Sequence, residues 1–266
     1  MRIGSQIWTW PDGGLGDKLA AIGKTGVAGV EAFVDDLKPY YASPGPLQRL
    51  LADAGVTLSG AYYGPANLMD RDAEKPVLAE VEEACRFLRE MGKCFLLVNG
   101  GVPKGQPPRE FSDAEFFQLA RMLNRIGALA GRIGIRSVVH PHMGCTVETP
   151  ADLDRLVAAG LDWSRIGLCT HAAHQYLIGA DPYVIGEKYA PRVRYVHLGN
   201  ADADRKGTLL AAGVLDQRRL MDPLLRAGFN GWLIVESTQD GLPQADYVAD
   251  AVAYLKRTWP GLQWLD

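Results

Sequence analysis

Eight short runs of β-branched and other apolar residues recur along the chain, and longer stretches of helical period separate them. The predicted strands are Ile3–Trp8, Gly29–Val34, Thr57–Ala61, Cys94–Val98, Ile135–His140, Ile166–Thr170, Val193–Leu198 and Trp232–Glu236. They begin on average about once per 33 residues, which is the length of one strand-and-helix repeat. Eight such repeats predict an α/β fold with a single (β/α)₈ TIM barrel. The 266-residue chain matches the roughly 250 residues of one barrel, so we expect residues 1–266 to form one domain.

Helix start signals support this organisation. Ser112 followed by Glu115 predicts a capped helix start, and the apolar positions from Phe116 to Ala130 then keep a helical period. Thr149-Pro150 predicts another helix start. No glycine-rich dinucleotide motif follows any predicted strand, which disfavours an open doubly wound sheet.

Composition excludes several functional classes. Hydrophobic residues make up 47% of the chain and charged residues 22%, as in ordinary globular proteins. A net charge of −3 argues against a nucleic-acid partner, and no apolar run reaches the roughly 20 residues of a membrane span. The four cysteines lack the spacing of a disulfide or zinc framework. Because no signal-peptide pattern opens the chain, we expect a cytoplasmic protein.

All five histidines of the chain lie at or just after the ends of predicted strands. Together with the glutamate that closes the eighth strand, they are His140, His142, His171, His174, His197 and Glu236. The catalytic groups of a TIM barrel project from the carboxyl ends of its strands, so these side chains should meet at one mouth. A lone histidine is more often a packing residue, but this convergence favours a metal site.

Four successive strands supply the predicted metal ligands His140, His171, His197 and Glu236. Imidazole and carboxylate together suit Mn, Fe, Co, Ni or Zn. Ligands from four strands can surround one ion and leave coordination positions open, as catalytic sites do.

Further residues near the predicted strand ends have candidate roles. His142 and His174 are candidates for general acid–base catalysis, or for orienting a ligand. Glu148 is a third acid–base candidate, although a carboxylate just before the Thr149 cap also suits the helix dipole.

Three residues at the ends of earlier strands are candidates for substrate binding. Glu31 points either into the mouth or towards a salt bridge with a neighbouring strand. Asn99 precedes Gly100-Gly101, where a substrate hydroxyl can approach the backbone closely. Trp8 offers an aromatic wall for a sugar, although packing is the more common use of such a residue.

Four segments carry a resemblance to a known family: His140–Thr149, Gly167–His174, Arg194–Leu198 and Gly231–Glu236. They resemble inosose dehydratases and their relatives in the xylose-isomerase-like barrel superfamily of sugar phosphate isomerases and epimerases. The resemblance implies a divalent metal, most often manganese or cobalt, and a sugar or polyol substrate. It also implies a homo-oligomer, since these barrels commonly form dimers or tetramers.

The family typically holds its metal with a carboxylate after strand five, an aspartate after strand six, a histidine on strand seven and a glutamate on strand eight. His197 and Glu236 match this pattern, whereas His140 and His171 depart from it. Gly199-Asn200 replaces the usual Lys-Asp pair. More neutral ligands leave the metal more Lewis acidic, and the missing strand-five glutamate disfavours epimerisation by paired glutamates.

The sequence therefore predicts a metal-dependent carbon–oxygen lyase, a dehydratase of a keto-sugar, keto-inositol or oxidised glycoside. The expected reaction removes a proton beside a carbonyl and stabilises the resulting enediolate. A keto-sugar isomerase or epimerase is the runner-up, and a non-catalytic sugar-binding barrel is the alternative of a different class. A multi-zinc endonuclease is disfavoured, because no histidine precedes His140 and the net charge does not suit DNA.

Overall fold

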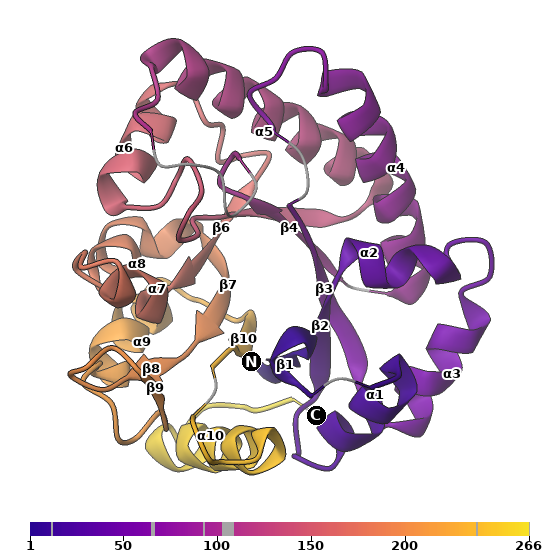
Figure 1. Cartoon of the computed structure of the whole chain (residues 1–266), viewed down its shortest axis with the longest axis vertical. Helices are drawn as coiled ribbons and strands as arrows, with labels where there is room; N and C mark the ends of the chain where they lie inside the picture. Colours follow the sequence, from indigo (N-terminus) through magenta and orange to yellow (C-terminus); the bar gives the residue numbers. More distant parts are fainter. Residues whose placement is uncertain (12, 65–66, 93, 103–108, 238, 266) are drawn as a thin grey trace.

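The computed structural model describes residues 1–11, 13–64, 67–92, 94–102, 109–237 and 239–265. Eight parallel strands close into a barrel in the order β1-β10-β7-β6-β5-β4-β3-β2 (Figure 1). These strands are β1 Arg2–Gln6, β2 Gly29–Phe33, β3 Thr57–Tyr63, β4 Phe95–Asn99, β5 Arg136–His140, β6 Gly167–His171, β7 Val193–Leu198 and β10 Trp232–Val235. The predicted (β/α)₈ barrel is confirmed, and the predicted strand ends differ from these by at most two residues.

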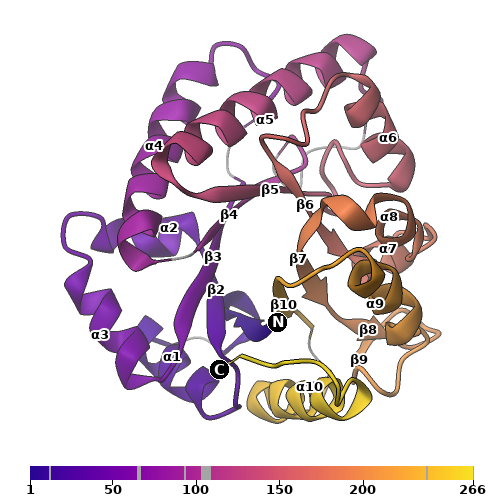
Figure 2. The same cartoon turned by 180° about the vertical axis from the view of Figure 1, so that it is seen from behind.

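Helices surround the barrel on its outside, as both views show (Figures 1 and 2). The α-helices are α1 Leu15–Gly23, α2 Val34–Leu37, α3 Gly45–Asp53, α4 Glu74–Met91, α5 Asp113–Ile133, α6 Pro150–Ala158, α7 Ala172–Leu177, α8 Val184–Tyr189, α9 Gln217–Arg226 and α10 Gln244–Thr258. Short 3₁₀ turns lie at Ile7–Thr9, Lys38–Tyr40 and Ala190–Arg192. Both predicted helix starts are confirmed, because Ser112 and Thr149 each close a capping box.

Strand periodicity places an apolar layer inside the barrel. Successive side chains of a strand point to opposite faces, so every second residue faces the interior. The inner layer consists of Phe95, Leu97, Val138, Cys169, Tyr195, Trp232 and Ile234. Two residues further along five of these strands come Asn99, His140, His171, His197 and Glu236. The same alternation that fills the barrel therefore places a polar layer on top of the apolar one.

Glycines on the first two strands make room for that apolar layer. A Cβ atom on Gly29 would lie 2.6 Å from the Trp232 ring, and one on Gly4 would lie 2.6 Å from Ile234 Cδ1. The small residues of β1 and β2 thus accommodate large ones from β10, which is how a barrel interior reaches native packing density.

The loop after β7 forms a small antiparallel hairpin, β8 Asn200–Ala201 and β9 Gly207–Thr208. Buried Asn200 holds it in place: its amide donates to the carbonyls of Leu210 and Leu215 and accepts from the N–H groups of Ala201 and Leu215. The chain ends lie side by side, with Leu265 N–H bonded to Met1 O. Within the described ranges, no helix combines the length and apolar character needed to cross a membrane.

Candidate metal centre and active site

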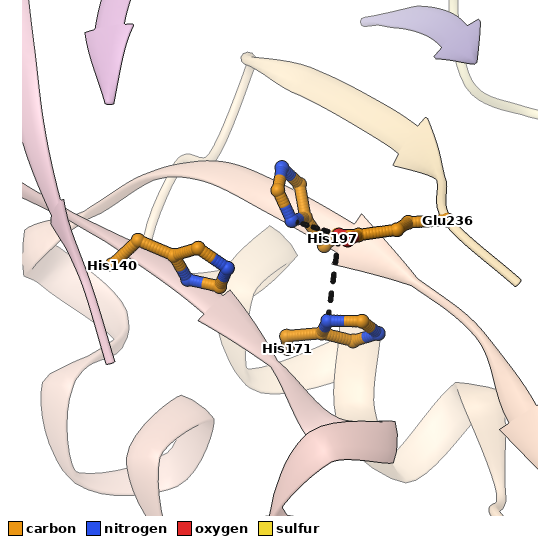
Figure 3. Close-up of side chains that lie close together, drawn as sticks. All are labelled: His140, His171, His197 and Glu236. Atoms are coloured by element: carbon orange, nitrogen blue, oxygen red, sulfur yellow. Dashed lines mark ion pairs between the residues drawn. The ribbon is translucent and has the colours of Figure 1, made fainter. Parts of the chain in front are cut away.

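Four buried donors from four neighbouring strands converge at one end of the barrel. His140, His171 and His197 end or nearly end β5, β6 and β7, and Glu236 directly follows β10. One ligand atom from each lies within 4.8 Å of all the others. Figure 3 shows the imidazoles gathered about the Glu236 carboxylate, with His171 Nδ1 at 3.6 Å from Glu236 Oε2. The structure thus brings together all four predicted ligands.

His197 is oriented by a carboxylate from the opposite side of the barrel. Its Nε2–H group donates to Glu31 Oε2 at 2.8 Å, and its Nδ1 faces Glu236 Oε2. Glu31 is fully buried and also accepts from Gln6 Nε2 at 2.6 Å. A histidine whose far nitrogen is held by a carboxylate presents its near nitrogen in a defined orientation, as metal-ligating histidines do.

The charges of this group are strongly coupled. Burial alone would lower the pKa of His197, but the Glu31 and Glu236 carboxylates outweigh it and raise the pKa to about 10. Burial would raise the pKa of Glu236, but His197 outweighs that effect and holds it well below its usual range. Burial lowers the pKa of His140 and of His171, so both rings are neutral near pH 7. Neutral rings with free lone pairs are the form that binds metals.

The pattern of unpaired polar atoms fits a metal ion. Neither ring nitrogen of His140 or of His171 has a hydrogen-bond partner among the described residues, and both side chains are buried. Buried polar groups without partners are rare and costly, so several in one place call for a ligand. Three imidazoles and one carboxylate suit the divalent ions from Mn to Zn, so this cluster could hold one.

A cavity of about 530 Å³ opens onto these donors. Its volume lies within the range of small-molecule sites. The predicted acid–base residues His142 and His174 also line it, with their ring centroids 4.5 Å apart. Apolar and aromatic side chains make up much of the remaining wall, namely Trp8, Phe33, Tyr62, Met143, Ala173 and Leu177.

Trp8 forms both a wall of this cavity and a contact to a predicted ligand. Its indole is half exposed, and its Nε1–H donates to Glu236 Oε1 at 3.0 Å. Trp8 therefore lies where the sequence analysis expected an aromatic wall. Its polar contact is to the carboxylate, which it helps to hold in place.

Three other candidates do not line the cavity. Glu148 accepts the backbone N–H of Gly144 at 2.8 Å and so braces the loop after β5. Asn99 donates to Gly64 O at 2.8 Å and accepts from Gly101 N–H, which ties two loops together. Glu31 forms an ion pair with His197, but that residue lies on β7, which does not neighbour β2, so the expected salt bridge to a neighbouring strand is wrong in its partner.

Sequence reasoning missed Gln6 as a site residue. Its amide oxygen accepts from Ile7 N–H while its NH₂ group donates to Glu31. The inward period of β1, counted from Gly4, was the signal that could have found it. Arg205 also lines the cavity, from the β8–β9 turn, with a positive φ of 62°.

Comparisons with known proteins place the chain among sugar-processing barrels. A protein of Bacillus licheniformis named inosose dehydratase is 27% identical to this chain, over 76% of this chain and 75% of the relative. A second protein of that name, from Lacticaseibacillus casei, is 30% identical over 97% of both chains. The apo crystal structure of a 3-keto-D-glucoside 4-epimerase from E. coli superposes with a TM-score of 0.75 at 20% identity, over 97% of this chain and 99% of that one. The chain also matches a fusion of a xylose isomerase-like TIM barrel with a 4-hydroxyphenylpyruvate dioxygenase, at a TM-score of 0.77 and 23% identity. It covers 44% of that longer protein, and 98% of this chain is matched.

The family model described as xylose isomerase-like TIM barrel matches residues 19–258, which is most of the chain and includes every donor of the cluster. The closed eight-stranded barrel accords with that match. The chain belongs to the xylose isomerase-like TIM barrel family.

Proposed function

We propose that this protein is a divalent-metal-dependent dehydratase of a keto-inositol or a closely related keto-sugar. The observation that carries the proposal is the convergence of His140, His171, His197 and Glu236 at the floor of one cavity. The relatives named inosose dehydratase support the choice of reaction.

His140, His171, His197 and Glu236 would hold the metal. When bound, such an ion supplies a Lewis acid that polarises a carbonyl and acidifies the neighbouring C–H bond. Glu31 and Trp8 position two of the ligand residues: Glu31 bonds His197 Nε2, the nitrogen turned away from the cluster, at 2.8 Å, and Trp8 Nε1 bonds Glu236 Oε1 at 3.0 Å.

His142 and His174 carry the proton transfers in this proposal. One imidazole takes the proton from the carbon beside the carbonyl, and the other protonates the β-hydroxyl as it leaves as water. The C–H and C–O bonds break, a C=C bond forms, and the two proton transfers balance. Both rings line the cavity with their centroids 4.5 Å apart, so they can serve neighbouring carbons of one substrate ring.

Epimerisation of a keto-sugar is the second candidate, because it shares the first proton transfer and the fold neighbour from E. coli is an epimerase. The cavity lining weighs against it. Glu236 is the sole carboxylate among the described residues that line the cavity, so a pair of glutamates is not available for exchange on both faces of a carbon. A non-catalytic sugar-binding barrel is the third candidate.

The test uses metal-reconstituted protein with a keto-inositol in heavy water. A dehydratase accumulates an unsaturated product with enone absorbance. An epimerase returns deuterated substrate without that absorbance, and a binding module gives neither. We expect the absorbance with wild type and its loss in His174→Ala; absence of both product and exchange with metal-loaded protein would overturn the proposal.

Manganese as the metal, a homo-oligomeric assembly, a cytoplasmic location and a single domain over residues 1–266 stay predictions. Elemental analysis of protein purified without chelator addresses the first of these, and light scattering the second. If wild-type protein carries no metal and also fails to bind added ions, the proposal of a metal-dependent reaction is contradicted.

A further inference from the structure

A second cavity of about 520 Å³ adjoins the candidate active site. Trp8 and Phe33 line both cavities, so the two spaces meet at these side chains. The second space, called the outer cavity from here on, lies against the 3₁₀ turn after β1, against α1, and against α2 with the turn that follows it. Its volume is that of a small-molecule site. A substrate with a second ring therefore has a place for that ring beside the active site.

Trp8 is the fixed part of the shared wall. Its Nε1–H group donates to Glu236 Oε1, and its backbone N–H group bonds the Gln6 side chain. The residue nevertheless stays half exposed. An aromatic ring that is already held in place loses little conformational freedom when a ligand packs on it. Sugar rings present apolar C–H faces that suit such a surface, and Tyr40 adds a second aromatic side chain to the outer cavity.

The charged side chains of the outer cavity balance one another. Asp35 is paired with Lys38 at 2.7 Å. The side chains of Asp36 and Lys18 also line this cavity, and neither has a hydrogen-bond or ion-pair partner in the part of the chain that the structure describes. A carboxylate accepts hydrogen bonds and an ammonium group donates them. One free acceptor and one free donor of opposite charge match a neutral ligand rich in hydroxyl groups better than they match an anion.

We propose that the outer cavity binds the second sugar ring of a keto-glycoside whose oxidised ring occupies the active site. Trp8 and Tyr40 pack against this second ring, and Asp36 and Lys18 bond its hydroxyl groups. An aromatic aglycone would use the same walls but would take water from the two charged groups without replacing its hydrogen bonds. The inference rests on the proposed function and narrows its closely related keto-sugar to a keto-glycoside.

Kinetics on substrates of one and two rings test the assignment. The probes are methyl keto-glucoside, phenyl keto-glucoside, and cellobiose, maltose and trehalose oxidised at the same ring carbon. With metal-reconstituted wild-type protein, kcat/KM for at least one keto-disaccharide should exceed that for methyl keto-glucoside by about tenfold or more, because contacts remote from the reacting carbon add binding energy. Asp36→Ala should reduce this preference to within about threefold and leave methyl keto-glucoside unaffected. Asp17→Ala is the matched control: this exposed carboxylate of α1 lines neither cavity, so the preference should persist.

Binding of the unoxidised disaccharides separates this inference from the proposed function, since sugars without a ketone cannot enter the reaction. Calorimetry with metal-free protein should show binding that weakens about tenfold in Asp36→Ala but not in Asp17→Ala. That result without turnover of any keto-sugar supports the outer cavity and counts against the dehydratase.

Three results overturn the second-ring assignment and leave the dehydratase proposal standing. They are turnover without preference for any keto-disaccharide, a preference that persists in folded Asp36→Ala, and a gain confined to phenyl keto-glucoside. Absence of both disaccharide binding and turnover overturns the two proposals together. Circular dichroism of each variant checks that it is folded.

Discussion

Replacing Glu31 by glutamine tests whether a buried carboxylate across the barrel controls metal binding. Glu31 accepts two hydrogen bonds, from Gln6 Nε2 at 2.6 Å and from His197 Nε2 at 2.8 Å. Glutamine keeps the shape but has one oxygen and one NH₂ group, so one of the two contacts then sets donor against donor. In the neutral form of His197 that binds a metal, the conflict is relieved when the remaining proton sits on Nδ1, the nitrogen that faces Glu236, where a metal ion must then displace it.

The magnitude follows from that mismatch. Leaving one buried donor unpaired costs about 1–3 kcal/mol. At about 1.4 kcal/mol per factor of ten, Glu31→Gln should weaken metal binding about 5- to 150-fold. This range overlaps the roughly 10- to 100-fold effect of losing a group that orients a metal-ligating histidine.

The assay is a manganese titration of chelator-treated protein, followed by calorimetry. Glu148→Gln is the matched control: it makes the same chemical change at a carboxylate that braces a nearby loop but does not line the cavity. It should leave the dissociation constant within about twofold. An unchanged manganese affinity in folded Glu31→Gln would refute the reasoning that Glu31 sets the proton position on His197.

Three further outcomes are expected. Trp8→Phe keeps an aromatic, though smaller, side chain and removes the partly exposed hydrogen bond from the indole to Glu236. A loss of about 1 kcal/mol would weaken metal binding about fivefold in the same titration, and an unaltered affinity would mean that this bond does not hold the ligand. Asn200→Ala removes four buried hydrogen bonds and should lower the free energy of unfolding, measured by urea titration, by about 2–4 kcal/mol. A loss below about 1 kcal/mol would contradict the role of Asn200 in holding the β8–β9 hairpin. Ser112→Ala breaks the capping box with Glu115 and should cost about 1 kcal/mol, or a melting temperature lower by roughly 2–4 °C; an unchanged melting temperature would show that the cap contributes nothing.

The extent of the barrel could be predicted because its signals are local. Strand runs, helix period and capping residues such as Ser112 and Thr149 each depend on a few neighbouring residues. The approximate position of each histidine was equally accessible, since a residue at a strand end lies at the same mouth in any barrel of this kind.

The roles of Glu31, Glu148 and Asn99 could not be predicted, because they depend on partners that only folding provides. Glu31 is on β2 and His197 is on β7, and they meet only because the sheet closes on itself. The register of β2 on β3 shifts between Val30 and Glu31, and no pattern in the sequence indicated that irregularity.

The sequence by itself determined the barrel, the number of its strands and which imidazoles gather at one mouth, because two-residue and 3.6-residue periods are properties of the local chain. Only the tertiary structure decided which nitrogen of His197 faces Glu236 and which carboxylates brace loops or line the cavity. Those choices follow from pairwise distances across a closed barrel, and such distances are set by strand register and interior packing together.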